Sequence, residues 1–117
     1  MNTFVLKKTH KILDRAKFVQ LSKFGRKFQD HYFIIVFMPG ESECSRLGIT
    51  ASKRVGNAVV RNRIKRLIRE WFRMNKSTIG GCWDVSVIAK KTASGLTSHQ
   101  VFMSLENIFD KLGGVRD

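Results

Sequence analysis

Acidic residues are scarce in this chain of 117 residues. The nine Asp and Glu stand at positions 14, 30, 41, 43, 70, 84, 106, 110 and 117, and no two form a DxD, ExK or HxxE arrangement. The three histidines also lie in unrelated segments, at His10, His31 and His99. Hydrolysis of a phosphodiester typically needs clustered carboxylates for metal ions, or a histidine with a partner acid or base. The sequence therefore predicts no catalytic residues and no metal ligands of its own.

Cysteines and long apolar runs are also few. Cys44 and Cys82 are the only cysteines, and neither belongs to a CxxC motif or lies near a histidine at metal-ligand spacing. The longest apolar run, Tyr32–Met38, is strand-sized and far below the roughly 18 residues of a membrane span. Residues 1–11 lack the apolar segment of a signal peptide. We therefore expect a cytoplasmic protein with reduced thiols and no membrane partner.

Positive charge is what the chain has in excess. It carries 22 Lys and Arg, a net charge of +13 and a pI near 10.5. Eight of these cations lie in residues 1–27 and eight in residues 53–73. Such a charge points to nucleic acid or an anionic membrane as partner. With 43% apolar residues the chain can also bury a core, so we expect one RNA-binding domain over residues 1–117.

The segment Lys53–Arg73 is the most basic part of the chain, with Glu70 as its single acid and Arg66 as a possible i to i+4 partner. Wound as a helix, it collects its apolar residues in one arc of about 100°: Val60, Ile64, Leu67, Ile68 and Trp71. The opposite arc holds Asn62, Lys65, Arg66, Arg69 and Arg73. This pattern predicts a helix that buries one face and presents cations to a polyanion such as nucleic acid.

Apolar periodicity and turn residues predict six elements: a helix over Asp14–Phe24, strands over His31–Met38 and Leu47–Ala51, a basic helix from Gly56 and Asn57 to about residue 75–77, a strand over Trp83–Ala89, and a closing helix containing Val101, Leu105, Ile108 and Leu112. Gly25 should end the first helix, and Ser98 should cap the last before Gly113 and Gly114 stop it. We expect the first two strands to pair as a hairpin. The order αββαβα predicts an α+β fold, a small α/β sandwich.

The run from Arg46 to Arg73, RLGITASKRVGNAVVRNRIKRLIREWFR, resembles the signature of the bacterial ribonuclease P protein subunit. Arg61, Asn62 and Arg63 match its RNR core, and AKK at Lys91 matches a strand end. The resemblance implies a left-handed βαβ crossover, as in the second domain of ribosomal protein S5. It also implies an accessory subunit of an enzyme whose RNA subunit, with Mg²⁺, removes the 5′ leader of precursor tRNA. No protein partner is evident.

The resemblance assigns site residues as well. The motif helix and the loop before it would bind the catalytic RNA through Lys53, Arg54, Arg61, Asn62, Arg63, Lys65, Arg66 and Arg69. For Arg63, packing near Glu70 or a strand end is an alternative, structural role. A cleft between the first helix and the sheet would hold the leader through Phe18, Phe33 and Lys90. The alternative for both rings is a place in the core, and Ser22 and Val36 stand where relatives carry aromatic residues.

Two other functions fit part of the pattern. A ribosomal-type protein that coats RNA without taking part in a reaction has the same size and charge, but has no reason to carry the motif. A domain on a membrane surface could use an amphipathic helix with Trp71 and Phe72. Against this second alternative, the flanking strands need the apolar arc of that helix for a core.

Overall fold

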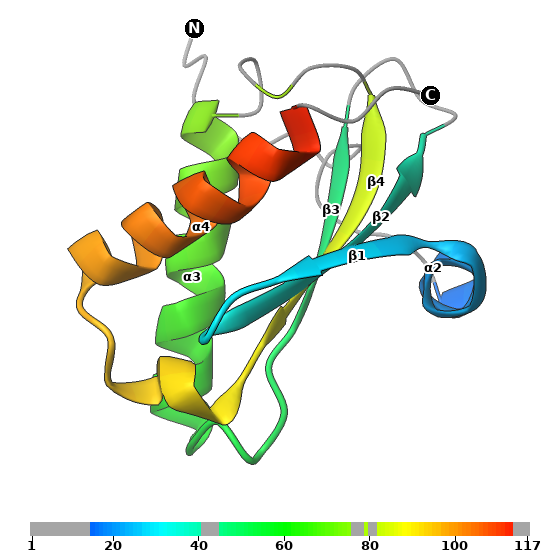
Figure 1. Ribbon diagram of the computed structural model, residues 1–117. Helices are drawn as coiled ribbons and strands as arrows, with labels where there is room; N and C mark the ends of the chain where they lie inside the picture. Colours follow the sequence, from blue (N-terminus) through cyan, green and yellow to red (C-terminus); the bar gives the residue numbers. More distant parts are fainter. Residues whose placement is uncertain (1–14, 41–44, 76–78, 80–81, 114–117) are drawn as a thin grey trace, which may run out of the picture.

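The computed structural model describes residues 15–40, 45–75, 79 and 82–113. Its elements in chain order are α2 (Arg15–Phe24), β1 (Arg26–Gln29), β2 (Phe33–Pro39), β3 (Arg46–Thr50), α3 (Ala58–Asn75), β4 (Trp83–Ala89), the 3₁₀ helix η2 (Lys91–Gly95) and α4 (Ser98–Gly113). In Figure 1 the sheet lies between two layers, with α3 and α4 on one side and α2 on the other. The α+β sandwich predicted from the sequence is confirmed. Asp14, Cys44 and Gly114, which also figured in the predictions, lie outside the described residues.

The sheet has the strand order β1-β2-β4-β3. β2 is antiparallel to both β1 and β4, whereas β3 is parallel to β4. The expected hairpin between β2 and β3 is therefore wrong, because β4 lies between them and pairs with β2 from Phe33↔Ala89 to Pro39↔Trp83. β4 is buried along almost its whole length, which suits a central strand covered on both faces. The shorter strand β3 forms one edge of the sheet.

The connection β3–α3–β4 is a left-handed crossover. In Figure 1 both strands run downwards with β3 behind β4, while α3 runs upwards to their left. Crossovers between parallel strands are right-handed in about 98% of cases. The general rule would thus have given the wrong hand, and the resemblance gave the right one.

The core lies between the sheet and the layer of α3 and α4. Alternate residues of β2 and β4 point into it and are fully buried: Phe33, Ile35, Phe37, Val85 and Val87. The predicted apolar arc of α3 is confirmed, with Ile64, Leu67, Ile68 and Trp71 buried, and Phe72 joins them. The rings of Trp71 and Phe109 lie 4.8 Å apart, which joins α3 to α4. One face of α3 is thereby fixed, and the opposite face is left for solvent or a partner.

Local hydrogen bonds explain where α3 and α4 begin. The Oδ1 atom of Asn57 accepts the Val60 N–H at 3.0 Å and caps α3. Gly56 before it has a φ of +156°, and a Cβ there would lie 2.9 Å from the Cβ of Val60, so glycine is required. α4 is capped by Thr97 rather than by Ser98, because Thr97 and Gln100 exchange reciprocal hydrogen bonds of 2.9 and 3.1 Å in a capping box.

β1 was not predicted. Three of its four residues are polar, so the apolar alternation that marks a strand is missing. It pairs with β2 alone and forms one edge of the sheet, with Phe28 stacked on Phe37 at 5.1 Å between ring centres. Asp30 then turns the chain, because its Oδ1 accepts the N–H groups of Tyr32 and Phe33 at 2.8 and 2.7 Å.

Candidate RNA-binding surfaces

The outer face of α3 is almost uniformly positive. Asn62, Arg66 and Arg69 are exposed, and Lys65 and Arg61 are half-buried. The single acid, Glu70, lies 3.5 Å from Arg73 in an i to i+3 ion pair, rather than serving as the partner expected for Arg66. Arg66 and Arg69 thus present their guanidinium groups on an ordered helix, one turn apart, where they can meet consecutive phosphates.

The loop between β3 and α3 extends this positive face. Lys53 and Arg54 are both exposed there, shortly before the Asn57 cap. The N-terminal end of a helix carries a partial positive charge of its own. The two predicted loop cations therefore lie at the end of α3 that already favours an anion.

The two arginines of the RNR core differ in their surroundings. Arg63 is half-buried and its Nη1 donates to the backbone carbonyl of Leu96 at 2.9 Å, in the loop that precedes α4. The structural alternative for Arg63 is thus supported, although its partner is neither Glu70 nor a strand end. Arg61 has a buried Nε with no hydrogen-bond acceptor among the described residues. The RNA-binding role of the exposed cations stays a prediction.

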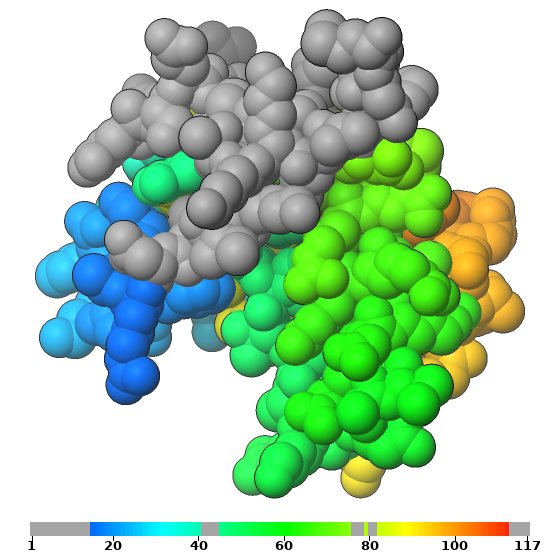
Figure 2. All heavy atoms as spheres, turned by 180° about the vertical axis from the view of Figure 1, so that it is seen from behind, coloured from blue at the N-terminus to red at the C-terminus, as the bar shows by residue number. Residues whose placement is uncertain are grey.

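A groove of about 300 Å³ lies between α2 and the sheet, where the leader cleft was predicted. It is lined by Phe18, Leu21, Ser22, Gly25, Lys27, Ile34, Val36, Thr50, Ser86 and Ile88. The half-buried ring of Phe18 lies against Gly48, where an added Cβ would be 2.3 Å from the ring's Cζ. Only a glycine at this position of β3 lets the ring approach the sheet so closely. In Figure 2, α2 in blue and α3 in green both reach the same side of the molecule.

Phe33 is not part of this groove. It is fully buried on the opposite face of β2, among the core residues under α3 and α4. Side chains alternate along a strand, so Ile34 and Val36 face the groove instead. Phe33 as a leader contact is therefore corrected to Phe33 as a core residue, because a ring with no exposed surface has no face to offer a base.

Lys90 also differs from its predicted role. Its Nζ donates to the backbone carbonyl of Asp30 at 2.6 Å, which fastens the end of β4 to the turn between β1 and β2. The exposed cation that does line the groove is Lys27. Lys27 pairs with Val36 across β1 and β2 and so lies on the same face. Lys27 was not predicted because the polar sequence of β1 gave no sign of a strand.

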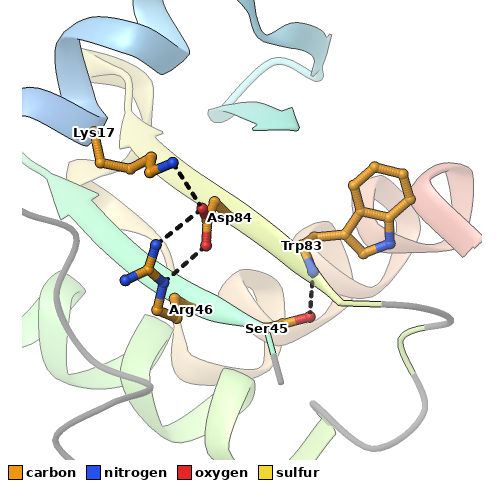
Figure 3. Close-up of polar contacts among 5 residues, drawn as sticks. All are labelled: Lys17, Ser45, Arg46, Trp83 and Asp84. Atoms are coloured by element: carbon orange, nitrogen blue, oxygen red, sulfur yellow. Dashed lines mark hydrogen bonds and ion pairs between the residues drawn. The ribbon is translucent and has the colours of Figure 1, made fainter. Parts of the chain in front are cut away.

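A buried ion cluster lies on the α2 side of the sheet and was not predicted either. Asp84 of β4 is fully buried, and Arg46 of β3 donates hydrogen bonds to both of its carboxylate oxygens, at 2.9 and 3.1 Å (Figure 3). Lys17 of α2 places its Nζ 3.5 Å from the Oδ2 of Asp84. Beside the cluster, the Oγ of Ser45 accepts the Trp83 N–H at 2.9 Å. The carboxylate of Asp84 thus forms ion pairs with two cations from two different elements.

No helix within the described residues is long and apolar enough to cross a membrane. In that same part of the chain, no three His, Cys, Asp or Glu side chains gather as they would around a metal ion.

Known proteins resemble this chain over nearly its whole length. The family model described as Ribonuclease P matches residues 6–113. The ribonuclease P protein component of Desulforapulum autotrophicum is 45% identical over 112 residues, which cover 96% of each chain. The RNase P protein structure from Staphylococcus aureus has a TM-score of 0.82 at 37% identity and covers 89% of this chain and 95% of that one. The RNase P protein structure from Thermotoga maritima has a TM-score of 0.80 at 31% identity and covers 92% of this chain and 99% of that one. This chain therefore belongs to the ribonuclease P protein family.

Proposed function

We propose that this chain, which is the accessory protein subunit of ribonuclease P, helps the RNA subunit remove the 5′ leader of precursor tRNA. The observation that carries the proposal is the helix α3, which buries its apolar arc and exposes Asn62, Arg66 and Arg69 in a chain that matches the family from residue 6 to 113. We place this function in the cytoplasm. The groove beside α2 supports a second RNA contact.

α3 is proposed to dock on the catalytic RNA. Guanidinium groups bind phosphates through paired N–H donors, and each phosphate contact releases condensed counterions, so binding depends on salt. Asn62 lies between the cations and has both a donor and an acceptor for sugar or base edges. The packing of the opposite arc holds these groups in place before the RNA arrives.

The groove is proposed to hold the single-stranded leader. Its volume of about 300 Å³ suits a nucleotide or two rather than a duplex. Phe18 forms part of its wall and can stack on an unpaired base, while the exposed Lys27 can meet a phosphate. Base stacking tolerates every sequence, which suits leaders that differ from one tRNA to the next.

The chemistry of cleavage is assigned to the RNA subunit. Mg²⁺ prefers oxygen ligands, especially carboxylates and phosphates. The residues proposed to contact RNA on the two surfaces offer cations, rings, hydroxyls and one amide, and none of them is a carboxylate. We therefore propose that the RNA holds the ions that activate water, while this chain binds and orients the two RNAs.

Reconstitution tests the proposal. Cleavage of precursor tRNA by the catalytic RNA at low Mg²⁺ should be faster with the chain than without it. The Phe18→Ala holoenzyme should bind precursor tRNA with a leader of several nucleotides more weakly by about 1 to 3 kcal/mol and bind mature tRNA as before.

Two results would count against it. An RNA-coating protein with no role in the reaction would bind RNA and leave the rate of cleavage unchanged. Equal losses of affinity for both RNAs, together with a lower melting temperature, would place Phe18 in the core and remove it from the leader site.

A further inference from the structure

α2 buries little of its surface against the described part of the chain. Of its ten residues, all of which the structure describes, Leu21 alone is buried. Phe18 and Lys17 are half-buried, whereas Val19 and Phe24 are exposed. Leu21 also lies apart from the main core between the sheet, α3 and α4. The position of α2 over the sheet therefore depends strongly on each contact that it makes.

One of these contacts is electrostatic and almost dry. The ammonium of Lys17 lies 3.5 Å from Asp84, with side-chain exposures of 12% and 0%. Arg46 holds both carboxylate oxygens from the neighbouring strand, so the carboxylate has a single orientation. A pair that is largely shielded from water is also screened little by salt.

This contact lies next to the groove. Lys17 is the chain neighbour of Phe18, whose ring lies on Gly48 and lines the groove. On β4 the residues that face α2 are Asp84 under Lys17, then Ser86 and Ile88 in the floor of the groove. The cluster thus fixes the first turns of α2, and the rest of the helix forms the wall.

We propose that Asp84 is a positioning residue for the leader: through Lys17 it fixes α2 and the ring of Phe18, and so sets the width of the groove. The inference rests on the proposed function, because it assumes that the groove binds the leader. Binding sites lose affinity when their groups are about 1 Å out of place. The affinity for the leader then depends on an ion pair that the RNA does not touch.

The test uses the reconstituted holoenzyme with three single variants of α2, with Asp84→Asn, and with the double variant that combines Asp84→Asn and Lys17→Gln. Lys17→Gln removes the positive charge that pairs with Asp84, and Lys17→Arg keeps a positive charge at the same position. Lys23→Gln is the matched control, because it removes an exposed charge from the same helix. For each variant, affinity is measured for precursor tRNA and for mature tRNA over a range of salt concentrations.

We expect Lys17→Gln to weaken binding of the leader-bearing RNA about tenfold, with mature tRNA and the salt dependence unchanged. Lys17→Arg should recover most of the loss, and Lys23→Gln should cause no loss that is specific to the leader. Asp84→Asn should reproduce the loss. If both residues act through one contact, combining Asp84→Asn with Lys17→Gln should weaken binding little further.

Three outcomes overturn the inference. A salt slope that falls by about one in Lys17→Gln would make Lys17 a phosphate contact. Equal losses for both RNAs would make the cluster a purely structural one, and additive losses in the double variant would separate the two residues. The proposed function fails at a different point, namely if the wild-type holoenzyme binds leader-bearing and mature tRNA equally well.

Discussion

The two faces of the β-sheet are built from the same strands and differ in character: one is uniformly apolar and the other mixes apolar and polar residues. On the side of α3 and α4, the side chains of β2 and β4 are large, apolar and without exposed surface, as Phe37 and Val85 show. On the side of α2, the sheet carries Asp84, Ser86 and Gly48 together with the half-buried apolar residues Ile34, Val36 and Ile88. The first face packs two helices tightly, and the second holds one short helix by a ring, a leucine and an ion pair.

Stability and binding are therefore divided between the two faces of the sheet. An apolar face closes completely because every methyl group gains from burial. A face with a glycine, a serine and a buried carboxylate cannot close in this way and leaves a groove of about 300 Å³ under α2. Variants on the first face should change folding, and variants on the second should change what the protein binds.

The largest effect is expected from a pair of phenylalanines on the two sides. Phe37 is fully buried, with its ring 5.1 Å from that of Phe28 and 5.5 Å from that of Trp83, so Phe37→Ala should lower the free energy of unfolding by about 3 to 5 kcal/mol. Phe24 at the end of α2 is 74% exposed, and Phe24→Ala should change the free energy of unfolding by less than about 0.5 kcal/mol. Denaturant unfolding measures both. Similar losses for the two would mean that α2 contributes to the core as much as β2 does.

Gly48 lies at the point where α2 meets the sheet. Gly48→Ala places a Cβ 2.3 Å from the ring of Phe18, so it should cost about 1 to 3 kcal/mol of unfolding free energy and displace the wall of the groove. Gly95→Ala, with no atom within 4 Å of the new Cβ, is the control and should be nearly neutral. Thermal melts and leader affinity report the two effects. A neutral Gly48→Ala would show that the ring moves aside freely.

The smallest single effect is expected on α3. Arg66→Ala should weaken binding to the catalytic RNA by about 1 kcal/mol and lower the salt slope by about one, with the melting temperature unchanged. Arg63→Ala should instead lower the melting temperature, because it leaves the Leu96 carbonyl without its donor. If the slope stays unchanged in a quadruple variant of Arg61, Lys65, Arg66 and Arg69, the helix does not bind phosphates.

Elements with a strong apolar period could be predicted from the sequence. The 18 residues of α3 bury the arc that was expected, because the 3.6-residue period repeats over five turns. β2 and β4 were also found, since they are rich in β-branched and aromatic residues. β1 gave no such signal. Strand order could not be predicted either, because it depends on pairings between β2 and β4 that are distant in the chain.

The role of a site residue could be predicted where it depends only on exposure. It could not be predicted where it depends on contacts with residues that are distant in the chain. Arg66 and Arg69 are exposed because the helical phase puts them opposite the core. Arg63 meets an acceptor 33 residues away, and Asp84 meets Arg46 at a separation of 38 residues. Phe33 was misplaced because the sequence of a strand gives its alternation but not which face meets the groove.

The strand β1 gives the positive charge of the protein a second use. It forms an edge of the sheet, and its outer row of backbone N–H and C=O groups pairs with no other strand of the described residues. Arg26 and Lys27 stand exposed on this edge. A second copy would bring the same two cations against them, so strand-to-strand aggregation is opposed by repulsion. The charge proposed to bind RNA should therefore also oppose association of copies through this edge, and neutralising Lys27 should weaken this repulsion as well as the proposed phosphate contact in the groove.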